Sequence, residues 1–434
     1  MKIIDQARAL PRVTKILLAT NAVNSFGGGL VFAFLWIYLQ DVRDLPVWVP
    51  ATTMAIQALT AMGGGLLWGT VLDRWSYRTV VGAVMTLAGL GTALYAVVTG
   101  PVTAVVAAIV YGFGLSGVGT ALRTMYASST SPEHRGVAFE LDFGIFNAMT
   151  GVGVLVGGAV VSAGFLDRAD RFALLYLADG VTFLITGLVA GLLLHGRKEP
   201  AGAGDAAGKP SYLTLLRDRR LFLLYAIMAA LMLVSFGQFR SGLPAYLTGT
   251  GAVTAGGLSF TFALDIAVIM VVQFLVMPRL RHVPRSTLLA ASGALLAASW
   301  VGVLIAGQFR HTAALLIAAL AIVLMAIAEV FVYPVVSTLV NNLAPDHLRG
   351  RANALLSLTL SSSSVLGPIL AGALIGWHGG IILVSVLIAL SLLAIVLVAP
   401  LRSRMPEGSD AETGEDEDAP PAKPDADDVE ATVG

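Results

Sequence analysis

Three charged residues lie deep inside long apolar stretches of this sequence: Arg240, Asp265 and Glu329. A charged side chain at bilayer depth is costly, so each should face a partner or a water-filled cavity. Arg240 and Asp265 lie about 12 residues on either side of a turn near Ala252, which places both roughly 15 Å below one surface at ~1.5 Å per helical residue. Their equal depth predicts an ion pair. The pair could be structural, or it could respond to a substrate or a proton.

Glu329 belongs to an apolar stretch that continues with Tyr333 and Pro334. Proline removes a backbone hydrogen bond and favours a kink just after the carboxylate. A carboxylate desolvated at this depth could exchange protons near neutral pH. We therefore interpret Glu329, Asp265 and Arg240 as candidates for proton coupling or substrate binding, with a static hydrogen-bonding role for Glu329 as the alternative.

Uncharged polar side chains interrupt other apolar stretches. Such groups at bilayer depth favour a cavity or a hydrogen-bonding neighbour. The cavity candidates are Asn21, Asn24, Gln238, Asn147 and Tyr333. Asp179 also lies in an apolar stretch, and for it a local partner is expected.

The composition predicts the environment of these residues. Charged residues make up 12% of the chain and hydrophobic residues 56%, against about 25% charged residues in soluble domains. With a mean hydropathy of +0.82, the sequence predicts a polytopic membrane protein. The absence of cysteine excludes disulfides and thiolate metal sites. No ATP-binding loop, metal-ligand cluster or nucleophile–base arrangement stands out, so an enzyme is not expected.

Apolar runs of about 20 residues or more predict twelve membrane-spanning helices. An all-α fold follows, because helices satisfy the backbone polar groups internally. The predicted spans are 14–40, 47–72, 79–99, 102–125, 139–164, 172–195, 220–248, 254–277, 286–307, 312–341, 351–376 and 379–400.

The basic residues predict the orientation of these spans. Twenty-two Lys and Arg residues fall on the side of the N-terminus, and only Arg43, Arg168, Arg171 and Arg310 fall on the other side. The positive-inside rule then places both termini in the cytoplasm. Arginine outnumbers lysine in a chain rich in Ala, Gly and Val, which is typical of a GC-rich bacterial genome, so the expected location is the bacterial inner (plasma) membrane.

A long polar connection divides the chain into two similar parts. We expect an N-terminal six-helix bundle at 1–195, a cytoplasmic loop at 196–219 and a C-terminal six-helix bundle at 220–404. Both parts carry a Pro-acid-His…Arg-Gly element after their fourth span, beginning at Pro132 and Pro345, which indicates a duplicated unit. Residues 405–434 hold eleven acids and one base, which predicts a disordered acidic cytoplasmic tail.

The connection between the second and third spans carries an acid and bases at spaced positions: Gly69, Asp73, Arg74 and Arg78. This pattern resembles the loop between helices 2 and 3 of the major facilitator superfamily. Ser76 departs from it where the family favours Gly, and Tyr77 where it favours a base. Together with twelve spans, the central loop and the internal repeat, the resemblance covers residues 1–404.

The resemblance implies the major facilitator fold, with twelve helices in two pseudo-symmetric halves. It also implies that spans 1, 4, 7 and 10 line a central cavity, while spans 2, 5, 8 and 11 flank it and form gates. The motif would then act at a cytoplasmic gate, next to an inner charge cluster whose ion pairs could hold the gate closed. The cluster candidates are Arg123, Glu133, Arg135, Glu140, Asp142 and Arg349.

The expected function is secondary transport of a small organic solute by alternating access. Proton-coupled efflux of a drug-like or amphipathic compound is the first hypothesis. Two departures from drug antiporters weaken it, since the fifth span lacks their Gly-Pro signature and no arginine lies near Gly117. The second hypothesis is an uptake porter or facilitator for a sugar or organic acid, with Arg240 binding an anion. A non-transporting membrane scaffold or sensor is the third.

The expected partners are a small-molecule substrate, protons and the lipid bilayer. No cofactor is expected, because the proton gradient would supply the energy. We expect no nucleic-acid partner and a monomeric protein.

Overall fold

The structure is a computed structural model that describes residues 10–74, 77–130, 135–193, 215, 217–280, 282–345, 348–376 and 380–405. Every regular element in these ranges is a helix. Of the central loop predicted at 196–219, residues 196–214 and 216 lie outside the described residues, as does the acidic tail predicted at 405–434 except for Met405.

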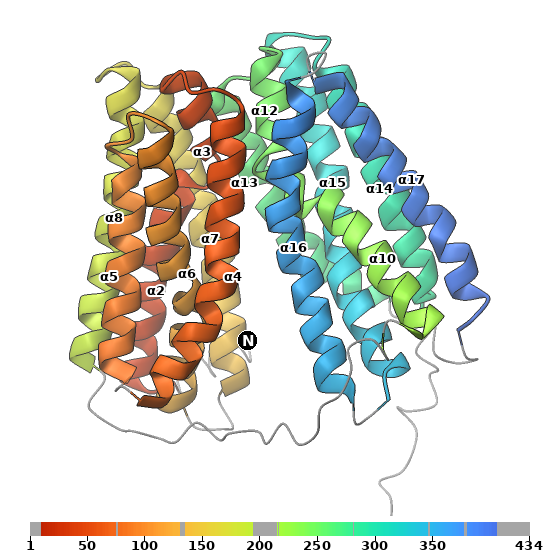
Figure 1. The fold of residues 1–434 in the computed structure, drawn as a ribbon, viewed down its shortest axis with the longest axis horizontal. Helices are drawn as coiled ribbons and strands as arrows, with labels where there is room; N and C mark the ends of the chain where they lie inside the picture. The colour runs from red at the N-terminus through yellow and green to blue at the C-terminus, as the bar shows by residue number, and fades with distance from the viewer. Residues whose placement is uncertain are drawn as a thin grey trace, which may run out of the picture.

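Helices α2 to α8 form the first half of the molecule, red to yellow-green in Figure 1. Its elements are α2 (Arg12–Val31), α3 (Leu35–Ile37), the π-helix η1 (Tyr38–Val42), α4 (Trp48–Arg74), α5 (Tyr77–Tyr95), α6 (Pro101–Ser129), α7 (Arg135–Ser162) and α8 (Arg168–Leu193).

Helices α10 to α17 form the second half, green to blue in Figure 1. Its elements are α10 (Arg219–Val234), α11 (Phe236–Phe239), α12 (Gly242–Gly249), α13 (Ala255–Val271), the π-helix η3 (Val272–Val276), the 3-10 helix η4 (Met277–Leu280), α14 (Arg285–Ala306), α15 (His311–Leu343), α16 (Arg349–Ile375) and α17 (Ile381–Arg402).

Most of these helices are long and apolar enough to cross a membrane. In the described part of the chain nine helices meet this condition, and a bent pair, Arg12–Val31 with Leu35–Val42, makes a tenth. Helix α4, with 27 residues, and the apolar helix Thr79–Tyr95 within α5 occupy the two remaining places in the predicted order. The protein is therefore an all-helical membrane protein, and the count of twelve spans stays a prediction.

Among the described residues, three helix pairs carry the more extensive contacts between the two halves. These are α7 with α13, α4 with α16, and α3 with α12. In Figure 1 the contacts of α3 and α12 lie at the upper end, and the halves diverge toward the lower end, where α2 begins and α17 ends. Small residues allow the close approach, since a Cβ atom added at Gly158 would lie 2.5 Å from the Cβ of Ser259.

Two predicted spans are interrupted. The helix axis bends by 44° between α2 and α3, and the span predicted at 220–248 is divided into α10, α11 and α12, with breaks at Ser235 and at Arg240–Ser241. Irregular backbone at membrane depth is tolerated where it is buried in protein or lines a cavity. The breaks therefore point to a special environment between the halves.

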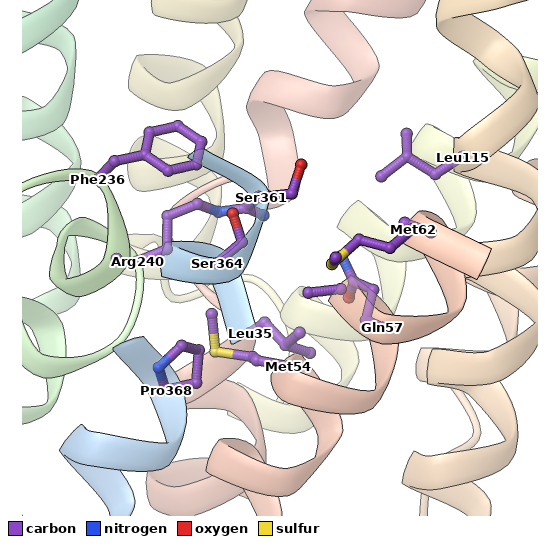
Figure 2. Close-up of a pocket in the computed structure, with 13 residues that line it drawn as sticks. Leu35, Met54, Gln57, Met62, Leu115, Phe236, Arg240, Ser361, Ser364 and Pro368 are labelled. Carbon is purple, nitrogen blue, oxygen red and sulfur yellow. The ribbon is translucent and has the colours of Figure 1, made fainter. Parts of the chain in front are cut away.

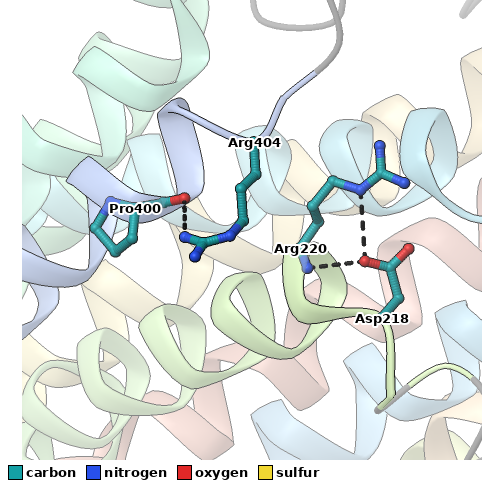
Figure 3. A network of polar contacts seen from close by, with 4 residues as sticks. All are labelled: Asp218, Arg220, Pro400 and Arg404. Carbon is teal, nitrogen blue, oxygen red and sulfur yellow. Dashed lines mark hydrogen bonds and ion pairs between the residues drawn. The ribbon is translucent and has the colours of Figure 1, made fainter.

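Polar contacts fix the ends of two helices in the second half. Asp218 is the N-cap of α10, where its carboxylate accepts from the backbone N–H of Arg220 at 2.8 Å and lies 3.5 Å from the Arg220 Nε (Figure 3). Arg404 donates to the carbonyl of Pro400 at 2.8 Å, after the last turn of α17. These contacts satisfy backbone groups that a helix end leaves open.

A glycine contact joins α2 and α7 within the first half. A Cβ added at Gly153 would meet the backbone carbonyl of Phe26 and would lie 2.9 Å from the Cα of Gly29. We expect Gly153→Ala to lower the free energy of unfolding by about 1–3 kcal/mol, because backbone atoms cannot move aside as a side chain can. The measurement is the thermal unfolding midpoint of the purified protein.

Gly144 on the same helix is the matched control, because a Cβ there meets nothing within 4 Å. Gly144→Ala is expected to leave the midpoint unchanged or to raise it slightly, since alanine is the better helix former. Equal midpoints for the two variants would contradict the close approach of α2 and α7.

Candidate functional site

A cavity of about 340 Å³ lies between the two halves. Its walls come from α3, α4 and α6 of the first half, and from α11, α16 and the break after α11 of the second (Figure 2). The apolar lining residues are Leu35, Met54, Ala58, Ala61, Met62, Leu115, Phe236, Gly237 and Pro368. The polar ones are Gln57, Arg240, Ser361 and Ser364. The cavity thus combines a large apolar wall with a few polar groups, which is typical of a site for an organic molecule.

Arg240 lies at the break between α11 and α12 and reaches across to the first half. Its Nε donates to the backbone carbonyl of Phe32 at 3.2 Å. Its guanidinium carbon lies 4.6 Å from the centre of the Phe32 ring, a cation–π geometry. Because Phe32 lies at the bend between α2 and α3, the two interrupted spans meet at this arginine.

Three phenylalanines support this contact from both halves. Phe239 and Phe262 of the second half stack with ring centres 4.2 Å apart. Both rings pack against Phe32 of the first half, at 6.3 Å and 6.2 Å. Aromatic pairs at these distances add to the stability gained from area burial. The position of Arg240 is therefore held by packing.

Asp265 on α13 and Glu329 on α15 form a carboxylate pair in the second half. Asp265 is 3% exposed, and the charge of Glu329 acts on it. The Oδ1 of Asp265 and the Oε1 of Glu329 are buried and have no hydrogen-bond partner in the described part of the chain. Ser235, at the break after α10, interacts with Glu329, while its hydroxyl also donates to the carbonyl of Leu231 at 3.0 Å.

The ion pair predicted between Arg240 and Asp265 is wrong. Both residues are described, and no salt bridge joins them: Arg240 contacts Phe32 across the interface, and Asp265 interacts with Glu329. The depth argument assumed regular helix, and Arg240 lies in a break where successive side chains do not follow the helical repeat. Of the three charged candidates, Arg240 lines the cavity.

None of the five uncharged cavity candidates is among the described residues that line the cavity. Asn21 is 2% exposed and donates to the Oδ1 of Asp142 at 2.6 Å. Gln238 is fully buried and donates to the carbonyl of Gly367 at 3.1 Å. Both bonds join helices that are distant in sequence, so these two side chains hold helices together.

The remaining three candidates differ in their surroundings. Asn24 is 9% exposed, and its buried Oδ1 accepts no hydrogen bond from any residue that the structure describes. Asn147 donates to the carbonyl of Phe143 at 2.9 Å, a bond within its own helix. Tyr333 is 44% exposed. Their roles in substrate binding stay predictions.

The gate motif can be followed only in its backbone. The ends of α4 and α5 contain its members Gly69, Asp73, Arg74 and Arg78. Their side chains lie outside the described part of the chain. The proposed gating role stays a prediction.

The inner charge cluster is described at a single position, Asp142, which accepts the bond from Asn21. Glu133 lies outside the described residues. For the other members only the helix is described: Arg123 in α6, Arg135 and Glu140 in α7, and Arg349 at the start of α16.

A chain of polar and aromatic contacts leads from the cavity into the first half. The hydroxyl of Tyr95 donates to the Oε1 of Gln57 at 3.3 Å, and its ring lies 6.3 Å from that of Tyr111. Asp179 acts electrostatically on Tyr111 and accepts from the hydroxyl of Thr92 at 2.8 Å. The local partner expected for Asp179 is thus Thr92.

Sequence reasoning missed several residues of the cavity. Gln57 is a polar residue inside a predicted span, so its type and depth were a usable signal. Ser361 and Ser364 belong to a run of four serines, and only the structure shows that these two line the cavity. Phe32 carries no signal, because an apolar residue in a span is expected to face lipid or the core.

A set of apolar helices in two halves, with an organic-molecule cavity between them, is the architecture of a membrane transporter. The chain belongs to the Major Facilitator Superfamily, whose family model matches residues 17–328 and 281–426. It is also similar to two Bacillus subtilis (strain 168) proteins described as uncharacterized MFS-type transporters. YttB is 25% identical over 392 residues, covering 89% of this chain and 94% of YttB. YhjO is 25% identical over 369 residues, covering 82% and 85%.

Solved transporter structures share the fold. The nucleoside transporter NupG superposes with a TM-score of 0.69 at 15% identity, over 91% of this chain and 99% of NupG. A bacterial homologue of the iron transporter ferroportin gives 0.70 at 17% identity, over 91% and 99%. These likenesses confirm the all-α major facilitator fold that the sequence predicts.

Proposed function

We propose that this protein is a proton-coupled secondary transporter that exports an amphipathic or drug-like organic compound by alternating access. The carboxylate pair of Asp265 and Glu329 carries the proposal. Two carboxylates buried together repel each other when both are charged, so a proton held by the pair is favoured. A group that gains and loses a proton inside the membrane can couple a proton gradient to a conformational change.

The position of the pair supports coupling to the cavity. Ser235 interacts with Glu329, and the next two residues, Phe236 and Gly237, line the cavity. On the other side, Asp265 lies one turn after Phe262, which stacks on Phe239 next to Arg240. A change in the charge of the pair therefore acts on the broken span that forms one cavity wall.

The direction of transport is proposed from the orientation. With both termini in the cytoplasm, as the basic residues predict, the contacts of α3 with α12 lie on the outer side of the membrane. A conformation in which the halves meet on the outer side is open toward the cytoplasm. An exporter takes up its compound in that conformation. An uptake porter uses the same two conformations, so the direction of proton movement separates the two functions.

Proton movement in liposomes tests the proposal. Compounds that raise the unfolding midpoint of the purified protein are first selected by thermal shift. Each is then added to proteoliposomes that contain the pH dye pyranine. Export by antiport predicts that protons move opposite to the compound, and uptake by symport predicts that they move with it. Transport of the compound without proton movement would overturn the coupling.

A further inference from the structure

We infer that the cavity between the halves binds an amphipathic organic anion, with its acidic head at Arg240 and its apolar body against α4 and α16. The inference rests on the proposed function, in which this cavity carries the substrate. It adds the charge of that substrate, which the proposed function leaves open.

The guanidinium of Arg240 is oriented by the first half, and no described carboxylate contacts it, although the charge of the buried Asp179 acts on it without a salt bridge. The Nε of Arg240 donates to the backbone carbonyl of Phe32, and the guanidinium lies over the ring of Phe32, which fixes the orientation of the guanidinium plane. Its two Nη atoms form no hydrogen bond with the described residues, and no described carboxylate forms a salt bridge with it. A fixed guanidinium with two free donors matches the two oxygens of a carboxylate, sulfonate or phosphonate.

The neighbouring polar groups also offer donors. Ser362 and Ser363 donate to the carbonyls of Thr359 and Leu360. Ser361 and Ser364 line the cavity, and their hydroxyls have no partner among the described residues.

Across the cavity, the oxygen of Gln57 accepts from the Tyr95 hydroxyl, which leaves its NH₂ group for a ligand. Figure 2 shows Arg240 and Ser364 on one side of the cavity and Gln57 with Met62 on the other. An anion bound between these donors would accept hydrogen bonds from both sides of the cavity.

The charge of the lining excludes other ligand classes. Of the described residues that line the cavity, Arg240 alone is charged. A cationic ligand would meet a like charge in a site of low polarity, which is unfavourable. The Asp265–Glu329 pair would attract a cation, but neither residue is among the described lining residues.

The apolar wall excludes small inorganic anions as the preferred ligand. Met54 and Met62 of α4 line the cavity together with Phe236 and Pro368 of the other half, and methionine side chains adapt to varied apolar shapes. A volume of about 340 Å³ is at the lower end of pockets that hold drug-sized molecules, roughly 300–1,000 Å³. The site therefore fits a compact apolar body that carries one acidic group.

Three probes with the same aromatic body test the inference: 1-naphthaleneacetate, the neutral 1-naphthaleneacetamide and the cationic 1-naphthylmethylammonium. Binding to the purified full-length protein in detergent is measured by thermal shift and calorimetry. We expect the anion to bind at least about tenfold more tightly than the amide, because its hydrogen bonds to Arg240 are charge-assisted. The cation is expected to bind most weakly. Equal binding of the amide or the cation, or no binding of any probe at millimolar concentration, would overturn the inference.

The Arg240→Gln variant should lose the preference for the anion, and Arg240→Lys should keep part of it, since lysine retains the charge without the planar fork. Arg402→Gln is the matched control, because Arg402 is exposed at the end of α17. A second variant, Ser361→Ala with Ser364→Ala, should weaken anion binding even if Arg240→Gln does not fold. An anion preference unchanged in both would overturn the inference.

The binding assay contains no proton gradient. If the liposome experiment shows no proton coupling, the preference for the anion can still be measured. If the anion is not preferred, the result says nothing against proton coupling.

Discussion

A variant with Ser162→Cys and Gly256→Cys is expected to lose nearly all transport on oxidation and to regain it on reduction. A Cβ at Gly256 would lie 3.5 Å from the Cβ of Ser162, a separation that a disulfide can bridge, since its usual Cβ–Cβ distance is roughly 3.5–4.5 Å. Ser162 ends α7 in the first half, and Gly256 begins α13 in the second. The disulfide would fasten the halves at the end where they already meet.

The size of the effect follows from alternating access. If the two halves rock about the central cavity, they must separate at this end once in every transport cycle. A covalent bond there prevents that step, so the remaining transport should approach that of empty liposomes. The chain contains no cysteine, so the engineered pair is the only thiol pair, and its oxidation can be followed without removing native residues.

Two controls distinguish a blocked cycle from a damaged protein. Each single cysteine variant should transport normally under oxidising conditions. A cross-link inside one half, Gly302→Cys with Ala321→Cys, joins α14 to α15, where the Cβ atoms would lie 3.0 Å apart. The two helices must move apart by about 0.5 Å for this disulfide to form, and the cross-link should leave transport largely intact. Undiminished transport by a fully cross-linked Ser162–Gly256 variant would contradict alternating access between these halves.

Helix positions could be predicted closely from the sequence because membrane spans are read from apolar length alone. The span predicted at 286–307 is Arg285–Ala306 in the structure, and the one predicted at 312–341 is His311–Leu343. Both helices are continuous and strongly apolar, so no tertiary contact competes with the local pattern.

The breaks in the first and seventh spans could not be predicted in the same way. Gly27–Gly29 precede the first break, and Gly237, Gly242 and Pro244 surround the second. Glycines are also common packing contacts in membrane helices, so their presence alone does not locate an interruption. The irregular backbone at the breaks is stabilised by groups of the other half, as the bond from Arg240 to the Phe32 carbonyl shows. Such contacts depend on how the two bundles pack against each other. The spacing of residues along one helix carries no information about that packing.

The candidate site shows the same limit. The cost of a charge in the membrane correctly indicated that Arg240 needs a polar environment, and the structure places it at the cavity. Depth alone could not tell which way the side chain points, so the partner predicted for it was wrong. Gln57 and Ser361 lie on different halves and meet around one cavity, a relation that requires the tertiary structure.

Neutralising the carboxylate pair is the second change with a large expected effect. Glu329→Gln should lower proton-driven transport about 5- to 150-fold, the range that corresponds to a coupling free energy of about 1–3 kcal/mol. The amide keeps the size and polarity of the side chain but cannot take up or release a proton. Asp265→Asn should act in the same direction, since Glu329 and Asp265 interact. The measurement is compound accumulation in proteoliposomes under an imposed pH gradient.

Exchange of labelled for unlabelled compound, which needs no proton gradient, should persist in both variants. Asp179→Asn is the control for loss of a buried carboxylate elsewhere: Asp179 lies in the other half, is bonded to Thr92 and interacts with Arg240. Its neutralisation can change the affinity for the compound, but it should leave the response to the pH gradient in place. Full proton-driven accumulation in a double variant, Glu329→Gln with Asp265→Asn, would remove the pair from the mechanism. A loss in Asp179→Asn alone would move the coupling site to the first half.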